Sequence, residues 1–412
     1  MPHACGTVSA ELGDQTVLVA GVDFYVEPSF FVLCVPIVVG AIALGLLERP
    51  LGRYGLAASA LMLFLLFFRS IPTLVYVCAY LAMSLLLYRW VRSLFLRDYP
   101  KAVGWYRVAL ACQIAPLAAY KVGVVFNPDF LGFLGISYIT FKAVQVLIET
   151  RDGLIRDMTA VEYLSFLCFF PSFTSGPIMR SRSFVEDLRT PLSRDAYLER
   201  LYRGIGWFVL GAVYKFVGSA LAKWAMWMVG STVHVAGLAW LGTVFCFGVD
   251  LFFDFAGYSN MAMGLGLMLG VEVPQNFRAP FLAKDIKEFW DRWHISLSTW
   301  LRDFVFMRFS QFALSRKLFA SRITTACAGF MVNMVLMGVW HGITWDYIAY
   351  GVYHGAMLAA CHYLQKKWKF YKKHKRERWF GIASWAVTML VVFFGFALFG
   401  GYVVSPLLGG AN

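Results

Sequence analysis

Ten long apolar runs dominate this sequence and constrain its fold more than any other feature. A helix needs roughly 20 predominantly apolar residues to cross the hydrocarbon core of a bilayer. The chain is also too apolar for a soluble protein, since 59% of its 412 residues are hydrophobic and 15% are charged, against roughly 45–50% and about 25% in soluble domains. The sequence therefore predicts an all-α polytopic membrane protein with about 10–11 transmembrane helices. The runs fall near residues 28–47, 54–68, 71–88, 102–120, 131–148, 205–229, 235–256, 323–343, 347–364 and 379–400.

Two shorter apolar segments, 160–171 and 261–271, cannot cross a bilayer alone. Both are flanked by proline or glycine, so we expect re-entrant or interfacial segments whose backbone is satisfied by protein or water. The polar segments 149–204 and 257–322 are too long for simple connections, and we expect function to draw on them.

Lysine and arginine gather on alternate loops between the predicted spans. Most of the 37 basic residues lie on one side, whereas the first 27 residues contain none. By the positive-inside rule the basic side is cytoplasmic, and an even number of spans then places both termini outside. The net charge of +13 is therefore mainly a topology signal, and no nucleic-acid partner is expected because no nucleic-acid-binding fold is visible.

A single histidine, His341, ends an otherwise apolar run. Polar groups inside a span are costly, so they deserve a functional hypothesis. An imidazole with an ordinary pKa of about 6.5 can act as a general base near neutral pH; a structural hydrogen bond to a neighbouring helix is the equally open alternative. Asn333 lies eight residues earlier, about 80° round an ideal helix, and either lines the same cavity or joins two helices.

A second histidine, His294, lies in the tryptophan-rich segment 285–303. Asp285 and Glu288 resemble a capping box that opens a helix, and the aromatic residues that follow keep helical spacing. We expect one continuous amphipathic helix at the cytoplasmic membrane surface. From the residues alone, an interfacial anchor is favoured over a catalytic role for His294.

Asp250 and Asp254 are four residues apart and share a helix face. With residues 258–260 they are expected to form the polar end of an apolar helix. They either line a cavity or proton relay, or they pair with a cytoplasmic arginine or cap the next segment.

No metal site is predicted, because His354 and His362 lack the one-turn spacing of a helical zinc pair, although Cys361 lies between them. The run 366–378 contains eight basic residues and one acidic residue. It suits either contact with anionic lipid or docking of an acidic soluble partner.

Several long motifs, in order, resemble the signature of the membrane-bound O-acyltransferase (MBOAT) family. The first histidine lies in KEFWDRWHISLSTWLRD and the second in Trp340-His341-Gly342, at the separation that the family pattern expects. The other matching motifs are DFAGYSNMAMG at 254–264, PQNFRAPF at 274–281, GISYITF at 135–141 and TSGPI at 174–178.

Within that family the chain resembles the D-alanyl-transfer (DltB-like) branch. Its length is close to that of the short form of the family, and the segment QVLIETRDG at 145–153 resembles the corresponding segment of that branch. RDFVFMRF at 302–309 replaces the Pro-Leu-Gly-Gly run that is usual in alginate-type O-acetyltransferases.

The resemblance implies a ring of membrane helices around a thin central funnel, with re-entrant and cytoplasmic amphipathic helices. It divides the chain into an N-terminal helical membrane region at 1–120, a catalytic core at 121–364 that contains both long cytoplasmic segments, and a basic loop with the last span at 365–412.

The activity implied is that of a bacterial cytoplasmic-membrane acyltransferase. It would take D-alanine from the phosphopantetheine thioester of an acidic cytoplasmic carrier protein toward a hydroxyl of a teichoic-type cell-envelope polymer, directly or through a protein intermediate outside. No tightly bound cofactor is expected, because the thioester arrives with the carrier. One alternative is an alginate-type polysaccharide O-acetyltransferase; a transporter or flippase is another.

The resemblance also assigns roles to residues. His341 is the expected general base, and His294 is expected to orient the substrate or polarise the acyl carbonyl. The expected substrate-binding residues are Asn333, Asp254, Ser298, Trp293 and Trp340. One tension remains, since the family fold requires His341 at a central neck whereas the predicted spans put it near the outer end of its helix.

Overall fold

The computed structural model describes residues 24–127, 130 and 132–408. Every regular element in this part of the chain is a helix, and no strand occurs in it. The all-α class expected from the apolar runs is therefore confirmed.

By their internal contacts the described residues form two compact units. The first unit comprises the described part of 9–213 together with 257–274, and the second comprises 214–256 with the described part of 275–412. Within the described residues the chain passes between the units three times. The crossings after Val213 and Ala256 fall within continuous helical stretches, Arg194–Thr232 and Ala236–Met268, whereas the crossing after Pro274 lies in a non-helical segment.

The helices of the first unit surround α5, in which every residue from Ile139 to Thr150 is buried. Helices α3, α4, α6 and α7 all contact it. The elements are α1 (Pro28–Leu46), α2 (Gly52–Phe67), α3 (Ile71–Leu96), α4 (Ala102–Phe126), α5 (Ile136–Arg151), α6 (Ala160–Cys168), the 3₁₀ turn η1 (Phe170–Ser172), α7 (Ser181–Arg189), α8 (Arg194–Ala212) and the last part of α10 (Ala236–Met268).

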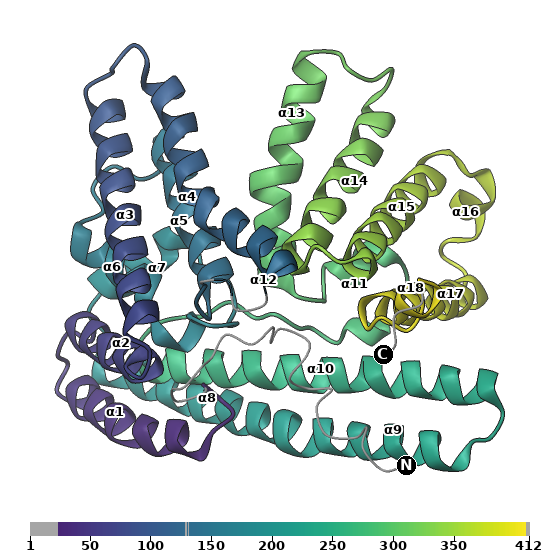
Figure 1. Cartoon of the computed structure of the whole chain (residues 1–412), viewed down its shortest axis with the longest axis horizontal. Coiled ribbons are helices and arrows are strands. Elements are labelled where there is room, and N and C mark those ends of the chain that lie inside the picture. Colours follow the sequence, from purple (N-terminus) through teal and green to yellow (C-terminus); the bar gives the residue numbers. More distant parts are fainter. Residues whose placement is uncertain (1–23, 128–129, 131, 409–412) are drawn as a thin grey trace. The chain divides into compact units, whose positions relative to one another are not determined.

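The second unit is built around a close pair of antiparallel helices, α14 and α15 (Figure 1). Helix α17 and the segments before α14 complete the unit. Its elements are the π segment η2 (Val213–Gly218), α9 (Ser219–Thr232), the first part of α10, η3 (Pro280–Leu282), α11 (Ile286–Trp290), α12 (Ile295–Leu301), the π segment η4 (Arg302–Phe306), α13 (Met307–Ser315), α14 (Arg322–His341), α15 (Trp345–Lys367), α16 (Lys369–His374), α17 (Arg378–Phe399) and α18 (Val404–Leu407).

Each of the ten predicted spans contains a helix in its described part, but seven of the described helices are long and apolar enough to cross a membrane by length and composition. Helices α2, α5 and α15 correspond to predicted spans but are not among these seven. The first two have only 16 residues each, about 24 Å at 1.5 Å per residue. Helix α5 also carries buried Lys142, Gln145 and Glu149, so its polar groups face protein.

The short apolar segment expected at 261–271 is wrong as a separate element. Helix α10 continues through it to Met268, so residues 258–260 lie inside this helix and are buried. The glycines that suggested a break instead allow close approach to α8, since a Cβ on Gly211 would lie 2.6 Å from the carbonyl oxygen of Gly257 and one on Gly264 would lie 2.5 Å from that of Gly204.

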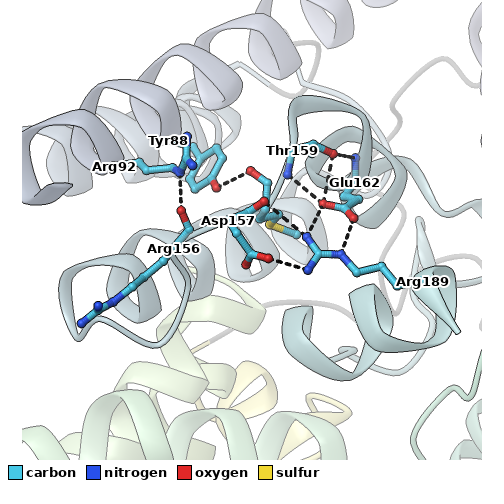
Figure 2. Close-up of polar contacts among 8 residues, drawn as sticks. Tyr88, Arg92, Arg156, Asp157, Thr159, Glu162 and Arg189 are labelled. Atoms are coloured by element: carbon cyan, nitrogen blue, oxygen red, sulfur yellow. Dashed lines mark hydrogen bonds and ion pairs between the residues drawn. The ribbon is translucent and has the colours of Figure 1, made fainter.

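A network around Arg189 fixes the connection between α5 and α6 in the first unit (Figure 2). The guanidinium donates to Asp157 Oδ2 and to Glu162 Oε1, each at 2.6 Å. Tyr88 on α3 donates to the carbonyl of Met158 at 2.7 Å. The hydrogen bonds from Arg189 lower the pKa of Glu162 to about 2, so this carboxylate is charged throughout the physiological range.

Candidate functional site: two histidines joined by a tryptophan

His341 is the last residue of α14, and aromatic rings surround it. Its ring centroid lies 4.5 Å from that of Trp340, 5.0 Å from Phe399 and 5.9 Å from Tyr347. Tyr350 adds a fourth ring at 6.4 Å. The imidazole is half-buried. It is therefore shielded from bulk water on several sides without being fully enclosed.

The close pairing of α14 with α15 sets this geometry. A Cβ on Gly338 would lie 2.3 Å from the carbonyl oxygen of Tyr347, and a Cβ on Gly351 would lie 2.5 Å from that of Met334. Only glycine permits backbones to approach so closely. A short connection, residues 342–344, then turns the chain so that Tyr347 and Tyr350 on the first turns of α15 face the end of α14.

Phe399, one of the four rings around His341, lies at the end of α17. Asp346 accepts hydrogen bonds from the Ser405 backbone N–H at 3.1 Å and from the Ser405 hydroxyl at 2.5 Å. These bonds tie the start of α15 to α18, just beyond the end of α17. Phe399, the last residue of α17, is held in this way against His341.

His294 interrupts the helix that the sequence predicts over 285–303, and that prediction is wrong at this residue. Asp285 caps α11 as expected by accepting from the N–H groups of Lys287 and Glu288, but α11 ends at Trp290. His294 has φ 44°, in the left-handed region. The carbonyl and side-chain oxygens of Asn276 accept from the N–H groups of Ile295 and Ser296 at 2.9 and 3.1 Å, which holds the break and starts α12 anew.

The imidazole of His294 is 4% exposed. Its ring lies edge-to-face with Phe255 at 4.6 Å, and its Nε2 has no hydrogen-bond partner among the described residues. Burial lowers the pKa of His294 well below its usual value, and the nearby His341 lowers it further. His294 is therefore neutral at physiological pH and keeps one ring nitrogen available.

Trp340 joins the two histidines. Its ring centroid lies 6.4 Å from that of His294 and 4.5 Å from that of His341. His294 immediately precedes α12, and Trp340 and His341 end α14; all three belong to the second unit. Residues that are far apart in the sequence therefore form one aromatic and imidazole cluster.

The other expected substrate-binding residues differ in how their side chains are engaged. Asn333 lies on α14, is 9% exposed and has an Oδ1 without a partner in the described chain. Trp293 is buried in an aromatic core with Phe277, Phe289 and Phe396. The remaining polar side chains are engaged: Ser298 Oγ donates to the Trp293 carbonyl at 3.2 Å, and Asp254 Oδ1 accepts from Lys215 Nζ at 2.6 Å.

The aspartate pair on α10 is held by lysines, not by a cytoplasmic arginine as one alternative expected. Asp254 pairs with Lys215, and Asp250 accepts from Ser219 Oγ at 2.5 Å with Lys223 Nζ 3.9 Å away. Lys215 lies in the π segment η2, a distortion that often marks functional positions in helices. The pairing makes Asp254 part of the contact between the η2–α9 stretch and α10.

Sequence reasoning missed the residues that enclose His341: Tyr347, Tyr350 and Phe399. The aromatic residues just after the Trp340-His341-Gly342 motif were a signal for the first two, because a short turn between two helices places such residues against the motif. No local signal pointed to Phe399. Within the described residues, no group of three or more histidine, cysteine, aspartate or glutamate side chains has the arrangement of a metal site.

A half-buried imidazole in an aromatic enclosure, beside a neutral histidine, suits proton transfer away from bulk water. In a helical membrane protein, this defines a candidate site for transferring a group to or from a hydroxyl. The sequence profile of the MBOAT, membrane-bound O-acyltransferase family, matches residues 57–405. The chain belongs to this family and is an O-acyltransferase of the multi-pass membrane type.

Individual relatives agree with this assignment. A teichoic acid D-alanyltransferase of Bacillus subtilis is 36% identical over 385 residues, which cover 90% of this chain and 96% of the relative. Another, from Streptococcus thermophilus, is 41% identical over 306 residues, 70% of this chain and 74% of the relative. A probable alginate O-acetylase of Pseudomonas aeruginosa is 33% identical over 273 residues, 65% of this chain and 48% of that protein.

Proposed function

We propose that this chain is a D-alanyltransferase of a bacterial cytoplasmic membrane. It takes D-alanine from the phosphopantetheine thioester of an acidic cytoplasmic carrier protein toward a hydroxyl of a teichoic-type polymer, directly or through a protein intermediate. Similarity to teichoic acid D-alanyltransferases along nearly the whole chain supports the substrate class. The observation that carries the chemistry is the half-buried imidazole of His341 beside neutral His294.

In the proposed reaction, the hydroxyl oxygen of the acceptor attacks the carbonyl carbon of the thioester. His341 takes the hydroxyl proton as the carbon–oxygen bond forms. The carbon–sulfur bond then breaks, and the imidazolium returns the proton to the thiolate that leaves. A protonated Nε2 of His294 would donate to the carbonyl oxygen and stabilise the charge that develops there. Because the donor is already an activated thioester, no nucleotide or metal is required.

The test is a transfer assay with purified protein, D-alanyl-loaded carrier and acceptor, read by mass spectrometry of the acceptor. We expect His341→Ala to lower the rate at least 100-fold, within the roughly 10²–10⁴-fold range of general-base catalysis. His234→Ala is the matched control, because His234 is exposed, and it should retain the full rate. Undiminished transfer by a folded His341→Ala protein would reject the proposed base.

The second candidate is acetyl transfer to an exported polysaccharide, favoured by similarity to probable alginate O-acetylases over 65% of the chain. Supplying the same preparation with acetyl-loaded and D-alanyl-loaded donors separates the two. Preference for the acetyl donor would move the assignment to that branch. Membership of an acyltransferase family leaves the transporter or flippase alternative without support.

A further inference from the structure

The segment between α15 and α17 contains the short helix α16 (Figure 1) and is rich in basic residues. All of its lysine and arginine side chains are exposed, and none of them forms an ion pair or hydrogen bond with another side chain in the described residues. Elsewhere Arg189, Arg200 and Arg203 each pair with a carboxylate. The eight basic residues are Lys366, Lys367, Lys369, Lys372, Lys373, Lys375, Arg376 and Arg378.

The one acidic residue of the segment is already engaged. Glu377 accepts a hydrogen bond from His374 Nδ1 at 2.9 Å and another from Trp379 Nε1. These contacts hold the turn between α16 and the start of α17. The carboxylate therefore stabilises the turn, while the lysine and arginine side chains around it remain exposed.

Half-exposed aromatic rings lie within the same segment. Phe370 is at the centre, with ring centroids of Trp368 at 5.1 Å, His374 at 4.4 Å and Trp379 at 6.2 Å. Trp368, Phe370 and Trp379 are 46%, 42% and 50% exposed. Tryptophan in such a position is typical of the level of the lipid headgroups, because its ring is apolar and its N–H is polar.

The aromatic cluster continues into an exposed apolar face of a candidate span. Helix α17 is long and apolar enough to cross a membrane, and several of its large apolar side chains are exposed. At 100° per residue these side chains fall on a face about 140° wide that includes Trp379. They are Trp379, Ile382, Val387, Leu390 and Phe394. Trp385 is also exposed, but it lies outside this face and donates to the Phe281 carbonyl at 2.8 Å.

We propose that residues 366–380 bind the phosphate headgroups of anionic phospholipid at the membrane surface, with the lysines and arginines on the phosphates and the rings of Trp368, Phe370 and Trp379 at the boundary with the acyl chains. Continuity with the lipid-facing side of α17 favours this partner over an acidic soluble protein, because it places the basic groups at the bilayer surface. By the positive-inside rule this surface is cytoplasmic, where anionic lipid attracts basic residues.

The experiment titrates the purified full-length protein in detergent with phosphatidylglycerol or zwitterionic phosphatidylcholine and counts retained lipid by native mass spectrometry. Each basic residue near an anionic surface contributes roughly fivefold in affinity. We therefore expect K372Q/K373Q to weaken phosphatidylglycerol binding about 25-fold and to leave phosphatidylcholine binding unchanged. The control R69Q removes an exposed charge from a loop that the positive-inside rule places on the opposite, outer side, and it should bind phosphatidylglycerol like the wild type. Equal retention by K372Q/K373Q and the wild type overturns the proposal.

A second arm locates the lipid and tests the competing partner. Brominated phosphatidylglycerol should quench tryptophan fluorescence more than brominated phosphatidylcholine, and W368F/W379F should remove that excess. In phosphatidylcholine nanodiscs, an acidic carrier protein should bind K372Q/K373Q and the wild type equally. If carrier affinity falls while lipid retention does not, the surface is a protein-docking site and the lipid proposal is wrong. Lipid retention is measured without acyl transfer, so the lipid proposal is tested independently of the proposed activity.

Discussion

At the scale of single residues, His294 has a left-handed backbone, with φ 44°, and it separates α11 from α12. The expectation of one helix over 285–303 rested on local spacing, which was sound on both sides of the break. The break depends on Asn276, nearly 20 residues earlier, which captures two N–H groups that a continuous helix would bond internally. Such a distant partner leaves no local pattern, so local reasoning could not have found it.

Burial of neutral His294 predicts a pH dependence of stability. Its pKa is lowered well below the usual value in the folded protein, so the unfolded chain binds a proton that the folded chain does not. The stabilising contribution of neutral His294 is therefore fully present above the unfolded pKa of about 6.5. As the pH is lowered below that value, the free energy of unfolding decreases by up to about 1.4 kcal/mol per pH unit. Thermal unfolding in detergent should show a smaller decrease from pH 7.5 to 5.5 for His294→Asn than for the wild type.

Asparagine is chosen for this substitution because it tolerates the left-handed backbone better than most residues. His234→Asn, at an exposed position, should keep the wild-type pH profile. Identical pH profiles for His294→Asn and the wild type would show that His294 does not titrate as its burial requires.

At the scale of elements, close approach of α14 and α15 positions His341. Gly338→Ala places a Cβ 2.3 Å from the carbonyl oxygen of Tyr347, which is backbone and cannot rotate away. We expect a loss of about 1–3 kcal/mol in unfolding free energy, as in other overpacked cores, and a lower transfer rate because Tyr347 and His341 move apart. Thermal unfolding and the transfer assay measure the two effects.

Gly206→Ala provides the control for that prediction, because a Cβ there meets nothing within 4 Å. It should stabilise the protein by roughly 0.5–1 kcal/mol, the usual gain from replacing glycine in a helix interior. If Gly338→Ala is as stable and active as Gly206→Ala, close helix approach does not position the site.

The ion pair between α6 and α7 predicts a second pH effect at more acidic pH. The pKa of Glu162 is held at about 2, below its unfolded value of about 4.3. Its contribution is therefore present above about pH 4.3 and is lost as the pH falls toward 2. Glu162→Gln should make the free energy of unfolding less dependent on pH over this acid range. At pH 7 it should lower that free energy by up to about 1 kcal/mol, a small loss because Arg189 is exposed and solvent weakens the pair.

Glu186→Gln serves as the control for Glu162→Gln. Glu186 is an exposed residue of α7, so its substitution removes the same charge without the ion pair. A Glu162→Gln protein that loses stability with acid as steeply as Glu186→Gln would contradict the pairing.

Helix boundaries show what sequence patterns can and cannot decide in this chain. Hydropathy located all ten apolar helices, because length and periodicity are local properties. It did not predict that α10 extends to Met268, since the proline or glycine flanking 261–271 indicated a separate segment when the close approach to α8 is not considered. Hydropathy also could not tell α5, enclosed by protein, from a lipid-facing span, because both are apolar.

At the scale of the whole molecule, charge placement predicts the orientation that the helices alone leave open. The basic segment 366–378 precedes α17 and is expected to stay in the cytoplasm, so α17 carries the C-terminus outward. His341, at the opposite end of α14 from the basic residues near Arg322, then lies toward the outer side, where an envelope acceptor could reach it.

Reporter fusions test this orientation directly. A periplasmic-type alkaline phosphatase, which needs disulfides that form outside the cytoplasm, should be active when fused after Asn412 and inactive when fused after Arg376. A fluorescent protein that folds in the cytoplasm should give the opposite pattern. Substituting the eight basic residues of 366–378 with glutamine should weaken this asymmetry, because the charges retain the loop inside. A C-terminal fluorescent fusion that is bright in the otherwise unchanged chain would reverse the orientation, because segment 366–378 would then lie outside the cytoplasm.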